Sequence, residues 1–184
     1  TATQAIVRIA FTDSSATNVR GESQTAGKTN YLLPDKKVAA KSYTKVAYDQ
    51  LYPGVDALFY ANAEQNLEYD FKVAPGADAS KIGLNITGAK RVSVSPKGLL
   101  TIKTAVGDMQ LQVPVAYQDT LFGRKTVKAK YQIQGTKISF DLASYDATQP
   151  LVIDPSVSYG TFLGGSSDDV IYASQYGSDG SMYV

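Results

Sequence analysis

The sequence predicts an all-β protein: an antiparallel β-sandwich with hairpin and meander connections, followed by a C-terminal strand pair. Three observations support this fold class. Apolar and polar residues alternate with period two in several stretches, which is typical of strands with one buried face. Turns containing Gly or Pro separate these stretches at the short spacing expected of hairpins. No segment of the sequence keeps a helical period over three turns, so we expect at most a short helical turn after Asp78.

Residues 67–73, LEYDFKV, form the clearest predicted strand. Its apolar side chains are expected to face the core, and these are Leu67, Tyr69, Phe71 and Val73. Its charged side chains are expected to face solvent, and these are Glu68, Asp70 and Lys72. A slip of one residue in register would exchange the two sets, so solvent exposure tests the prediction sharply.

Three later stretches repeat the alternation. In MQLQVPVAY, the residues expected on one buried face are Met109, Leu111, Val113 and Val115. In VKAKYQI and KISFDL, they are Val127, Ala129, Tyr131, Ile133, Ile138, Phe140 and Leu142. Pro114 cannot donate to a ladder, so it suggests an edge position or a bulge. The spacing of strands and turns predicts an up-and-down set of about five strands over residues 92–142.

The early residues 13–30 are polar and rich in turn-forming residues, so we expect a loop or a loose hairpin there. Within them, GESQTAGKT resembles a phosphate-binding loop. That motif has four residues between its first Gly and its Gly-Lys-Thr, whereas Gly21 and Gly27 enclose five, and Pro34 interrupts any helix that could follow. A surface turn is therefore the preferred interpretation.

Composition excludes several classes of function. The 184 residues contain 18 basic and 17 acidic side chains without an evident basic stripe, so we expect no nucleic-acid partner. The chain contains no Cys and no His, which excludes disulfides and catalysis by Ser–His or Cys–His pairs. The apolar runs are too short to span a bilayer, so no membrane insertion is expected. No signal peptide is visible at Thr1, so we expect that any export signal was removed or lies outside this sequence.

Two groups of acidic residues are candidate sites. Glu68 and Asp70 lie on one strand face, as a glycosidase pair would need, but Lys72 shares that face and alternation explains it as a solvated surface. Asp168, Asp169 and Asp179 lie in Gly- and Ser-rich corners and could supply oxygen ligands to calcium. Turn chemistry also explains Asp beside Gly, and the spacing does not match a helix–loop–helix calcium site. We therefore expect no enzymatic activity and no cofactor, with calcium as the weaker alternative.

Four stretches together resemble one family. They are YPGVDALFY (52–60), LEYDFKVAPGADASKI (67–82), VPVAYQ (113–118) and YDATQPLVIDPSVSYGTFLGG (145–165). In this order they are similar to an uncharacterised β-rich domain found in large bacterial exported proteins, directly upstream of SBBP-type β-propeller repeats. The resemblance implies a location outside the cell or on its surface, and it implies no catalytic residues.

The C-terminal residues resemble the first SBBP repeat, with expected repeat residues at Tyr159, Leu163, Gly164, Gly165, Asp168 and Asp169. We expect a sandwich domain over 1–155 and a partial repeat unit, or assembly tail, over 156–184. A single repeat unit cannot bury its own apolar face. The tail is therefore expected to pair with an edge of its own domain or, preferably, of a neighbouring subunit. The residues expected at that interface are Val157, Tyr159, Phe162, Leu163, Val170, Ile171, Tyr172 and Tyr176.

These observations predict a non-enzymatic, exported structural module at the cell surface. It would scaffold a repeat array or self-assemble by strand addition, with a filament as one outcome. Its expected partner is a second copy or a neighbouring repeat domain. The alternative is a carbohydrate-binding or adhesive module that uses exposed members of the 13 tyrosines to bind a glycan.

Overall fold

The computed structural model describes residues 5–33, 36–62, 67–155, 157–158, 175–176 and 182–183. In these residues the protein is all-β, which confirms the predicted fold class. The strands are β1 (Arg8–Phe11), β2 (Asn18–Leu33), β3 (Lys36–Tyr52), β4 (Val55–Ala61), β5 (Leu67–Val73), β6 (Gly83–Thr87), β7 (Arg91–Val94), β8 (Leu100–Lys103), β9 (Asp108–Leu111), β10 (Val115–Thr120), β11 (Gly123–Gln134), β12 (Lys137–Leu142), β13 (Leu151–Asp154), β14 (Val157–Ser158), β15 (Gln175–Tyr176) and β16 (Met182–Tyr183). Among the described residues, no helix is long and apolar enough to cross a membrane.

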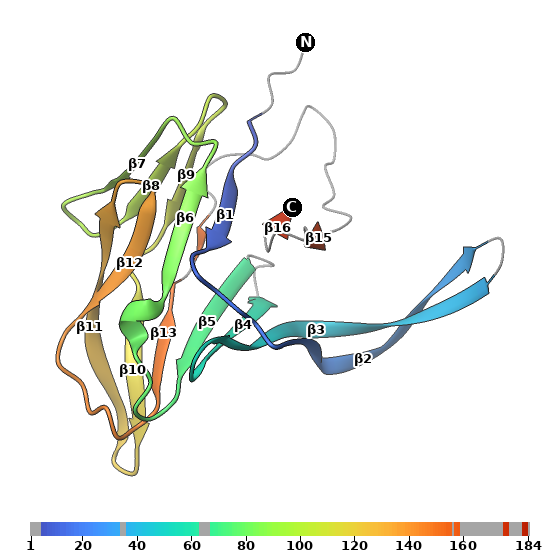
Figure 1. The fold of residues 1–184 in the computed structure, drawn as a ribbon, viewed down its shortest axis with the longest axis horizontal. Coiled ribbons are helices and arrows are strands. Elements are labelled where there is room, and N and C mark those ends of the chain that lie inside the picture. The colour runs from blue at the N-terminus through green and yellow to red at the C-terminus, as the bar shows by residue number, and fades with distance from the viewer. Residues whose placement is uncertain are drawn as a thin grey trace.

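Ten of the described strands form one antiparallel sheet in the order β1-β6-β12-β11-β10-β13-β5-β4-β3-β2. The sheet folds over at β11, since residues 123–128 of this strand pair with β10 and residues 129–134 pair with β12. One strand thus belongs to both layers, as at the corners of β-sandwiches. The layer of β1, β6 and β12 faces the layer of β10, β13, β5 and β4 (Figure 1). The two end strands, β1 and β2, do not pair with each other in the described residues, so the sheet stays open.

The short strand β13 joins two groups of strands that are far apart in the sequence. It pairs with β10 on one side and with β5 on the other, so that Ile153 lies opposite both Ala116 and Phe71. In the order of this sheet, no other strand links the group β2, β3, β4 and β5 to the group β6, β10, β11 and β12. The ten-stranded sheet is therefore continuous only because β13 occupies this position.

A smaller sheet of β7, β8 and β9 covers one end of the sandwich, and β14 adds to its edge (Figure 1). Val157 of β14 lies opposite Leu111 of β9 in the same chain. The side chains of Leu100, Ile102 and Leu111 are fully buried, so this sheet closes the core at that end.

An aromatic cluster holds the two layers together. The ring of Phe71 in β5 lies 5.9 Å from that of Phe11 in β1 and 5.8 Å from that of Phe140 in β12, measured between centroids. Both contacts are edge-to-face, an arrangement that adds to the energy of burial. Phe59 contacts Phe11 at 6.0 Å and Tyr69 at 5.6 Å. The core of the sandwich therefore centres on β5.

The structure confirms the prediction for β5. Tyr69, Phe71 and Val73 are buried and Leu67 packs against the same core, whereas Lys72 is exposed. Alternation also holds in β11 and β12: Val127, Ala129, Tyr131, Ile138 and Phe140 are buried, and Ile133 and Leu142 pack against the core. The helical turn after Asp78 is a 3-10 helix at Ala79–Lys81, capped by the Asp78 carboxylate, which accepts from the Ser80 amide.

The prediction for residues 109–117 is wrong beyond Leu111. This stretch contains two strands in different sheets, because Pro114 lies between β9 and β10 and cannot donate to a ladder on either side. After Pro114 the buried face is carried by even-numbered residues: Ala116 and Gln118 are buried, whereas Val115 is 48% exposed. Val113, in the same connection, is 39% exposed. Residues 92–142 consequently do not form one five-strand meander but two meanders, β7–β9 and β10–β12, in separate sheets.

The prediction for residues 13–30 is also wrong. From Asn18 onward they form most of β2, a strand of 16 residues that pairs with β3. The segment GESQTAGKT is therefore neither a phosphate loop nor a surface turn. Gly21 lies in the ladder opposite Val46, Ser23 has a positive φ of 55°, and the register shifts between Gln24 and Lys28. The polar composition reflects solvent on both faces of the strand.

Candidate assembly site: the hairpin arm

The strands β2 and β3 extend far beyond the sandwich as a two-stranded projection (Figure 1). Pairing between β3 and β4 begins only at Lys45, opposite Tyr60. We call residues 24–33 and 36–44, which lie beyond this point, the arm. Among the described residues, each strand of the arm pairs only with the other, and β2 has no partner on its outer edge. The arm therefore presents two open strand edges, and one of them continues along the whole of β2.

The arm has no hydrophobic core of its own. Apart from Tyr43, its described side chains are small, polar or basic, and most of them are exposed. None of them belongs to the core cluster, whose first member in β3 is Tyr48. An isolated two-stranded hairpin is marginally stable in water. The arm consequently depends on its root, where β2 and β3 join the sandwich, or on a partner.

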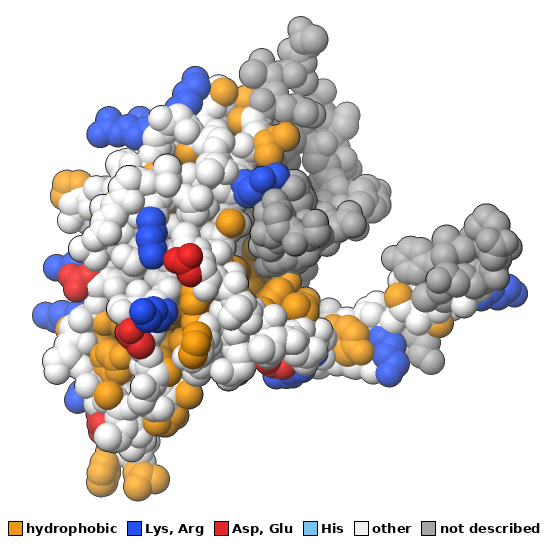
Figure 2. Space-filling model, in the orientation of Figure 1, with side chains coloured by type: hydrophobic (Ala, Val, Ile, Leu, Met, Phe, Trp, Pro, Cys, Tyr) orange, Lys and Arg blue, Asp and Glu red, His pale blue; other side chains and the backbone are white. Residues whose placement is uncertain are grey.

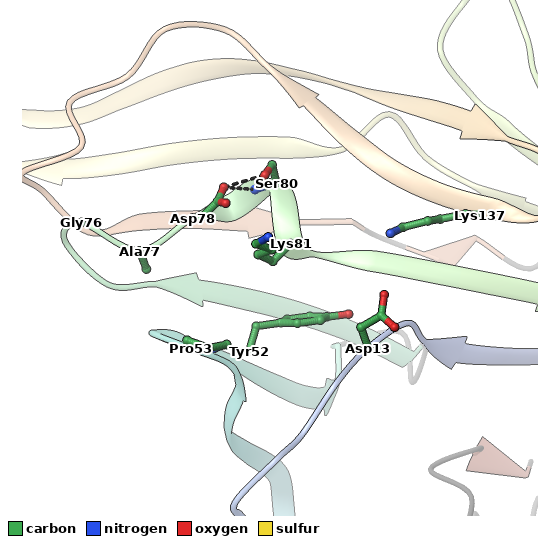
Figure 3. Close-up of a pocket in the computed structure, with 9 residues that line it drawn as sticks. All are labelled: Asp13, Tyr52, Pro53, Gly76, Ala77, Asp78, Ser80, Lys81 and Lys137. Carbon is green, nitrogen blue, oxygen red and sulfur yellow. Dashed lines mark hydrogen bonds between the residues drawn. The ribbon is translucent and has the colours of Figure 1, made fainter.

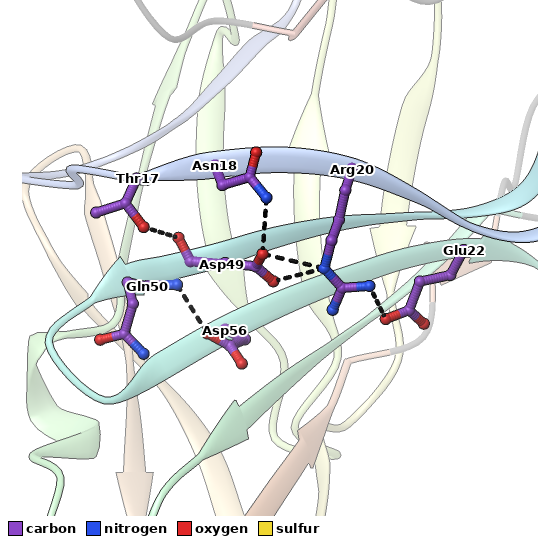
Figure 4. A network of polar contacts seen from close by, with 7 residues as sticks. All are labelled: Thr17, Asn18, Arg20, Glu22, Asp49, Gln50 and Asp56. Atoms are coloured by element: carbon purple, nitrogen blue, oxygen red, sulfur yellow. Dashed lines mark hydrogen bonds and ion pairs between the residues drawn. The ribbon is translucent and has the colours of Figure 1, made fainter.

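A polar network fixes the root (Figure 4). Both carboxylate oxygens of Asp49 accept from Arg20 Nε, at 3.1 and 3.0 Å, and one of them also accepts from Asn18 at 3.1 Å. Arg20 Nη1 also lies 2.6 Å from Glu22. Hydrogen bonds from Arg20, and then Asn18, lower the pKa of Asp49 below its usual value. Exposed ion pairs contribute little to stability, so the network mainly fixes the register of β2 on β3.

A second set of bonds bends β3 where it enters the sandwich. Gln50 has a positive φ of 53°, and its amide donates to the Asp56 carboxylate at 2.7 Å. Its side-chain oxygen accepts from the Gly54 amide at 3.0 Å. The β3–β4 register shifts between Tyr48 and Tyr52 at this point. The bend is thus held by side chains of β3 and β4, and it fixes the direction in which the arm leaves the sandwich.

An exposed apolar patch lies at the root. Val19, Tyr43 and Val46 are 55%, 42% and 38% exposed. They surround Gly21, which lies opposite Val46, and the Tyr43 ring occupies the space that a side chain on Gly21 would need. We call these three side chains the root patch. An exposed apolar patch beside an open strand edge is a combination that favours association.

The structure places few of the predicted assembly residues. Val157 is in β14, paired with β9 of its own chain, and Tyr176 is in β15, opposite Met182 of β16. The other predicted interface residues, Tyr159, Phe162, Leu163, Val170, Ile171 and Tyr172, lie outside the described residues. The candidate calcium ligands Asp168, Asp169 and Asp179 also lie outside them. In the described part of the chain, no group of three or more acidic side chains is arranged to hold a metal ion.

Glu68 and Asp70 lie on the outer face of β5, as predicted, but both carboxylates accept hydrogen bonds from neighbouring side chains. Glu68 accepts from Asn62 at 2.8 Å, and Asp70 accepts from Tyr60 at 3.2 Å. Burial raises the pKa of Asp70. Burial, with the nearby charges of Asp70 and Glu68, raises the pKa of Asp154 to about 6. These acids come from adjacent strands of one sheet face, so they do not enclose a substrate bond from two sides as a glycosidase pair must.

A surface pocket is present beside the 3-10 helix (Figure 3). The Tyr52 hydroxyl in its wall donates to the Gly83 carbonyl at 3.0 Å and lies 3.3 Å from the Gly83 amide. The Asp78 carboxylate is occupied by the amide and hydroxyl of Ser80. These polar groups stabilise the fold itself, so the pocket offers no evident reactive pair.

The described tyrosines do not form one exposed row. Tyr48, Tyr52, Tyr69 and Tyr131 are buried. The exposed Tyr43 packs over Gly21 in the root patch. Tyr117 lies under the guanidinium of Arg124, 3.6 Å from the ring centroid. Most of the described tyrosine rings are therefore buried or packed against other residues of the chain, and they do not form a platform for sugar stacking.

The fold and the arm define an all-β, sandwich-like domain with a projecting two-stranded hairpin. The chain belongs to the family described as "Domain of unknown function (DUF7948)", whose model matches residues 1–156. No curated protein matches the chain, and no solved structure does.

Sequence reasoning missed the arm, although a signal was present. Pro34 and Asp35, a turn-forming pair, stand between two stretches of 16 and 17 residues that contain no Pro. The second stretch is rich in Val, Tyr and Thr, which favour strands. Two stretches of nearly equal length on either side of a turn pair indicate a long hairpin.

Proposed function

We propose that this domain is a non-enzymatic structural module of an exported protein, and that it joins neighbouring copies or repeat units by strand addition at the arm. The observation that supports this proposal best is the open outer edge of β2, which is 16 residues long. Proteins usually protect such edges with short strands, bulges, charged side chains such as Lys, or covering elements. In β2 the edge has one register shift, between Gln24 and Lys28, a positive φ at Ser23, and one Lys among 16 residues.

A partner strand would supply what the arm lacks. Adding one strand to β2 makes a three-stranded sheet, which is the smallest sheet expected to be stable by itself when one face is covered. Backbone hydrogen bonds would provide affinity, and contacts with side chains on alternate positions would provide specificity. The root patch offers such contacts, because Val19, Tyr43 and Val46 lie beside the open edge.

The C-terminal tail is the donor that we favour. Its first residues, Val157 and Ser158, pair with β9 of the same chain, so any donated strand would come from the residues after them. A tail given to the arm of the next copy makes a head-to-tail contact, which can propagate as a filament. In a longer protein with SBBP-type repeats, the neighbouring repeat would occupy the same edge.

The chemistry of the chain agrees with a role that is not enzymatic. With no His or Cys in the sequence, catalysis would depend mainly on carboxylates. The candidate pair Glu68 and Asp70 accepts hydrogen bonds from neighbouring side chains on one sheet face, and Asp78 accepts from the Ser80 amide. The open edge of β2, with the root patch beside it, instead supports a role in association.

The test compares the oligomeric state of the full chain with that of a variant without the arm. Glu22 and Lys45 are directly opposite each other, so an Asn-Gly turn can replace residues 23–44 and close the hairpin at that point. The network of Arg20, Glu22 and Asp49 is kept. By light scattering coupled to size exclusion, we expect the full chain to associate with increasing concentration and the armless variant to stay monomeric.

A matched control removes exposed apolar surface elsewhere. Leu121 and Phe122 in the β10–β11 turn are 100% and 101% exposed, and their double substitution by Ser should leave association unchanged. The corresponding change at Val19 and Val46 should weaken it. A full chain that is monomeric at every concentration, or an armless variant that associates as the full chain does, would overturn the proposal.

A further inference from the structure

The charge of the protein is unevenly distributed. The whole chain has a formal net charge of +1, yet the arm contains four lysines and no acidic residue in its two strands. These lysines are Lys28, Lys36, Lys37 and Lys41. Asp35, in the connection between the strands, lies outside the described residues. Figure 2 shows Lys and Arg side chains along the projecting hairpin. The sequence of the arm is thus basic although the whole chain is nearly neutral, and the side chains of Lys37 and Lys41 are exposed on its surface.

The strand register brings two of these lysines together. Lys28 lies directly opposite Lys41 in the antiparallel ladder. Directly opposite residues have Cβ atoms about 4.5–5.5 Å apart, and like charges at this spacing destabilise a sheet. The arm has no core to compensate for this repulsion. The register therefore places positively charged residues of both strands at the same level of the arm.

Among the residues that the structure describes, the exposed lysines of the arm have no anionic partner. Lys37 and Lys41 are exposed, and neither makes an ion pair with a described residue. Around them are polar groups able to bind hydroxyls and carboxylates: Gln24, Thr29 and Asn30 are exposed, and Ser42 is partly exposed. The arm therefore combines unneutralised positive charge with uncharged hydrogen-bonding groups along an extended ribbon.

We infer that the arm binds an acidic polysaccharide, a sugar chain with carboxylate or sulfate groups. Its charge is complementary, and an extended polymer can lie along the ribbon and contact lysines on both strands. The arm contains no arginine, the residue preferred for two-pronged contacts to phosphate and for stacking on bases, so a nucleic acid fits less well. This inference does not depend on the proposed assembly, because it uses the lysines of the arm and not its open edge.

Binding of the full chain to heparin and to polygalacturonate, measured by calorimetry at low and at physiological salt, tests the inference. The variant Lys37→Gln/Lys41→Gln should bind about tenfold more weakly, a loss of about 1.4 kcal/mol. The control Lys90→Gln/Lys103→Gln removes the same charge from exposed positions at β8 and its neighbouring turn, and it should bind within about twofold of the original chain. Neutral dextran should not bind.

Three results would overturn the inference. They are no binding of either acidic polymer at low salt, equal weakening by the arm and control variants, and tighter binding of double-stranded DNA than of both polysaccharides. A chain that stays monomeric but binds the polysaccharides through Lys37 and Lys41 would support this inference while contradicting the proposed assembly. Circular dichroism of both double variants should match that of the original chain, since all four positions are exposed.

Discussion

The sandwich and the arm are built from the same antiparallel ladder, yet they differ in what covers their faces. In the sandwich, β5 has β13 and β4 on its two edges and an opposing layer on one face. In the arm, each strand has one described neighbour and solvent on both faces. Backbone hydrogen bonds alone therefore determine that a segment is a strand, whereas burial determines how stable it is. The predictions below test this difference, beginning with the largest expected effect.

Phe71→Ala should destabilise the protein by about 3–5 kcal/mol, the range for emptying a buried aromatic site. Phe71 is completely buried and its ring contacts both Phe11 and Phe140 in the opposing layer. Chemical denaturation followed by circular dichroism measures the loss. The neighbouring Lys72→Ala, on the exposed face of β5, should change stability by less than about 0.5 kcal/mol. Similar effects of the two substitutions would show that β5 does not separate core from solvent.

Gln118→Ala should cost about 1–3 kcal/mol, the penalty for leaving buried polar groups unsatisfied. The Gln118 side chain is 2% exposed. Its nitrogen donates to the carbonyls of Asp146, Gln149 and Pro150, and its oxygen accepts from the Asp146 amide at 3.0 Å. Hydrogen exchange should become faster at the Asp146 amide. Gln132→Ala, at an exposed position of β11, is the control, and an equal loss there would refute this explanation.

Asp154→Asn should remove a pH-dependent destabilisation. The folded pKa of Asp154 is raised from 3.8 to about 6, so the folded state binds its proton more tightly than the unfolded state does. The side chain therefore lowers stability as pH rises from about 4 to about 6, and the loss then stays constant. Relative to the original chain, Asp154→Asn should gain stability across that interval and keep the gain at pH 7. Denaturation at pH 4, 5, 6 and 7 measures it, and a constant difference would contradict the raised pKa.

Replacing residues 23–44 by Asn-Gly should have the smallest effect on the sandwich, within about 0.5 kcal/mol. No described side chain of the arm contributes to the core cluster. In the intact chain, amides of the arm should exchange faster than those of β5, because local opening of the arm exposes no core. A cooperative loss of the whole fold on removing the arm would show that the two regions are one unit.

The sequence predicts the sandwich well because one face of each strand is buried. The four stretches that carry the family resemblance overlap β4, β5, β10 and β13, which are neighbours in the sheet although they are far apart in the chain. Alternation misleads at Pro114, where the buried face changes from odd to even residues; the proline marks an interruption but does not say that the next strand belongs to another sheet. Alternation gives no signal in the arm, since a strand with two solvated faces has no hydrophobic period. The arm, which is the candidate site, is therefore the part least visible to pattern analysis.

The position of β13 has a consequence for the order in which the protein folds. The hairpins β10–β11–β12 and β3–β4–β5 contain only contacts between neighbouring segments, so they can form early. The pairing of Phe71 with Ile153 closes a long loop, and the entropy of that closure makes it a late step. During synthesis, the backbone groups on the free edges of β5 and β10 stay unpaired until Leu151–Asp154 has been made. A nascent chain that stalls before this strand exposes both edges at once, which makes that interval the most prone to aggregation.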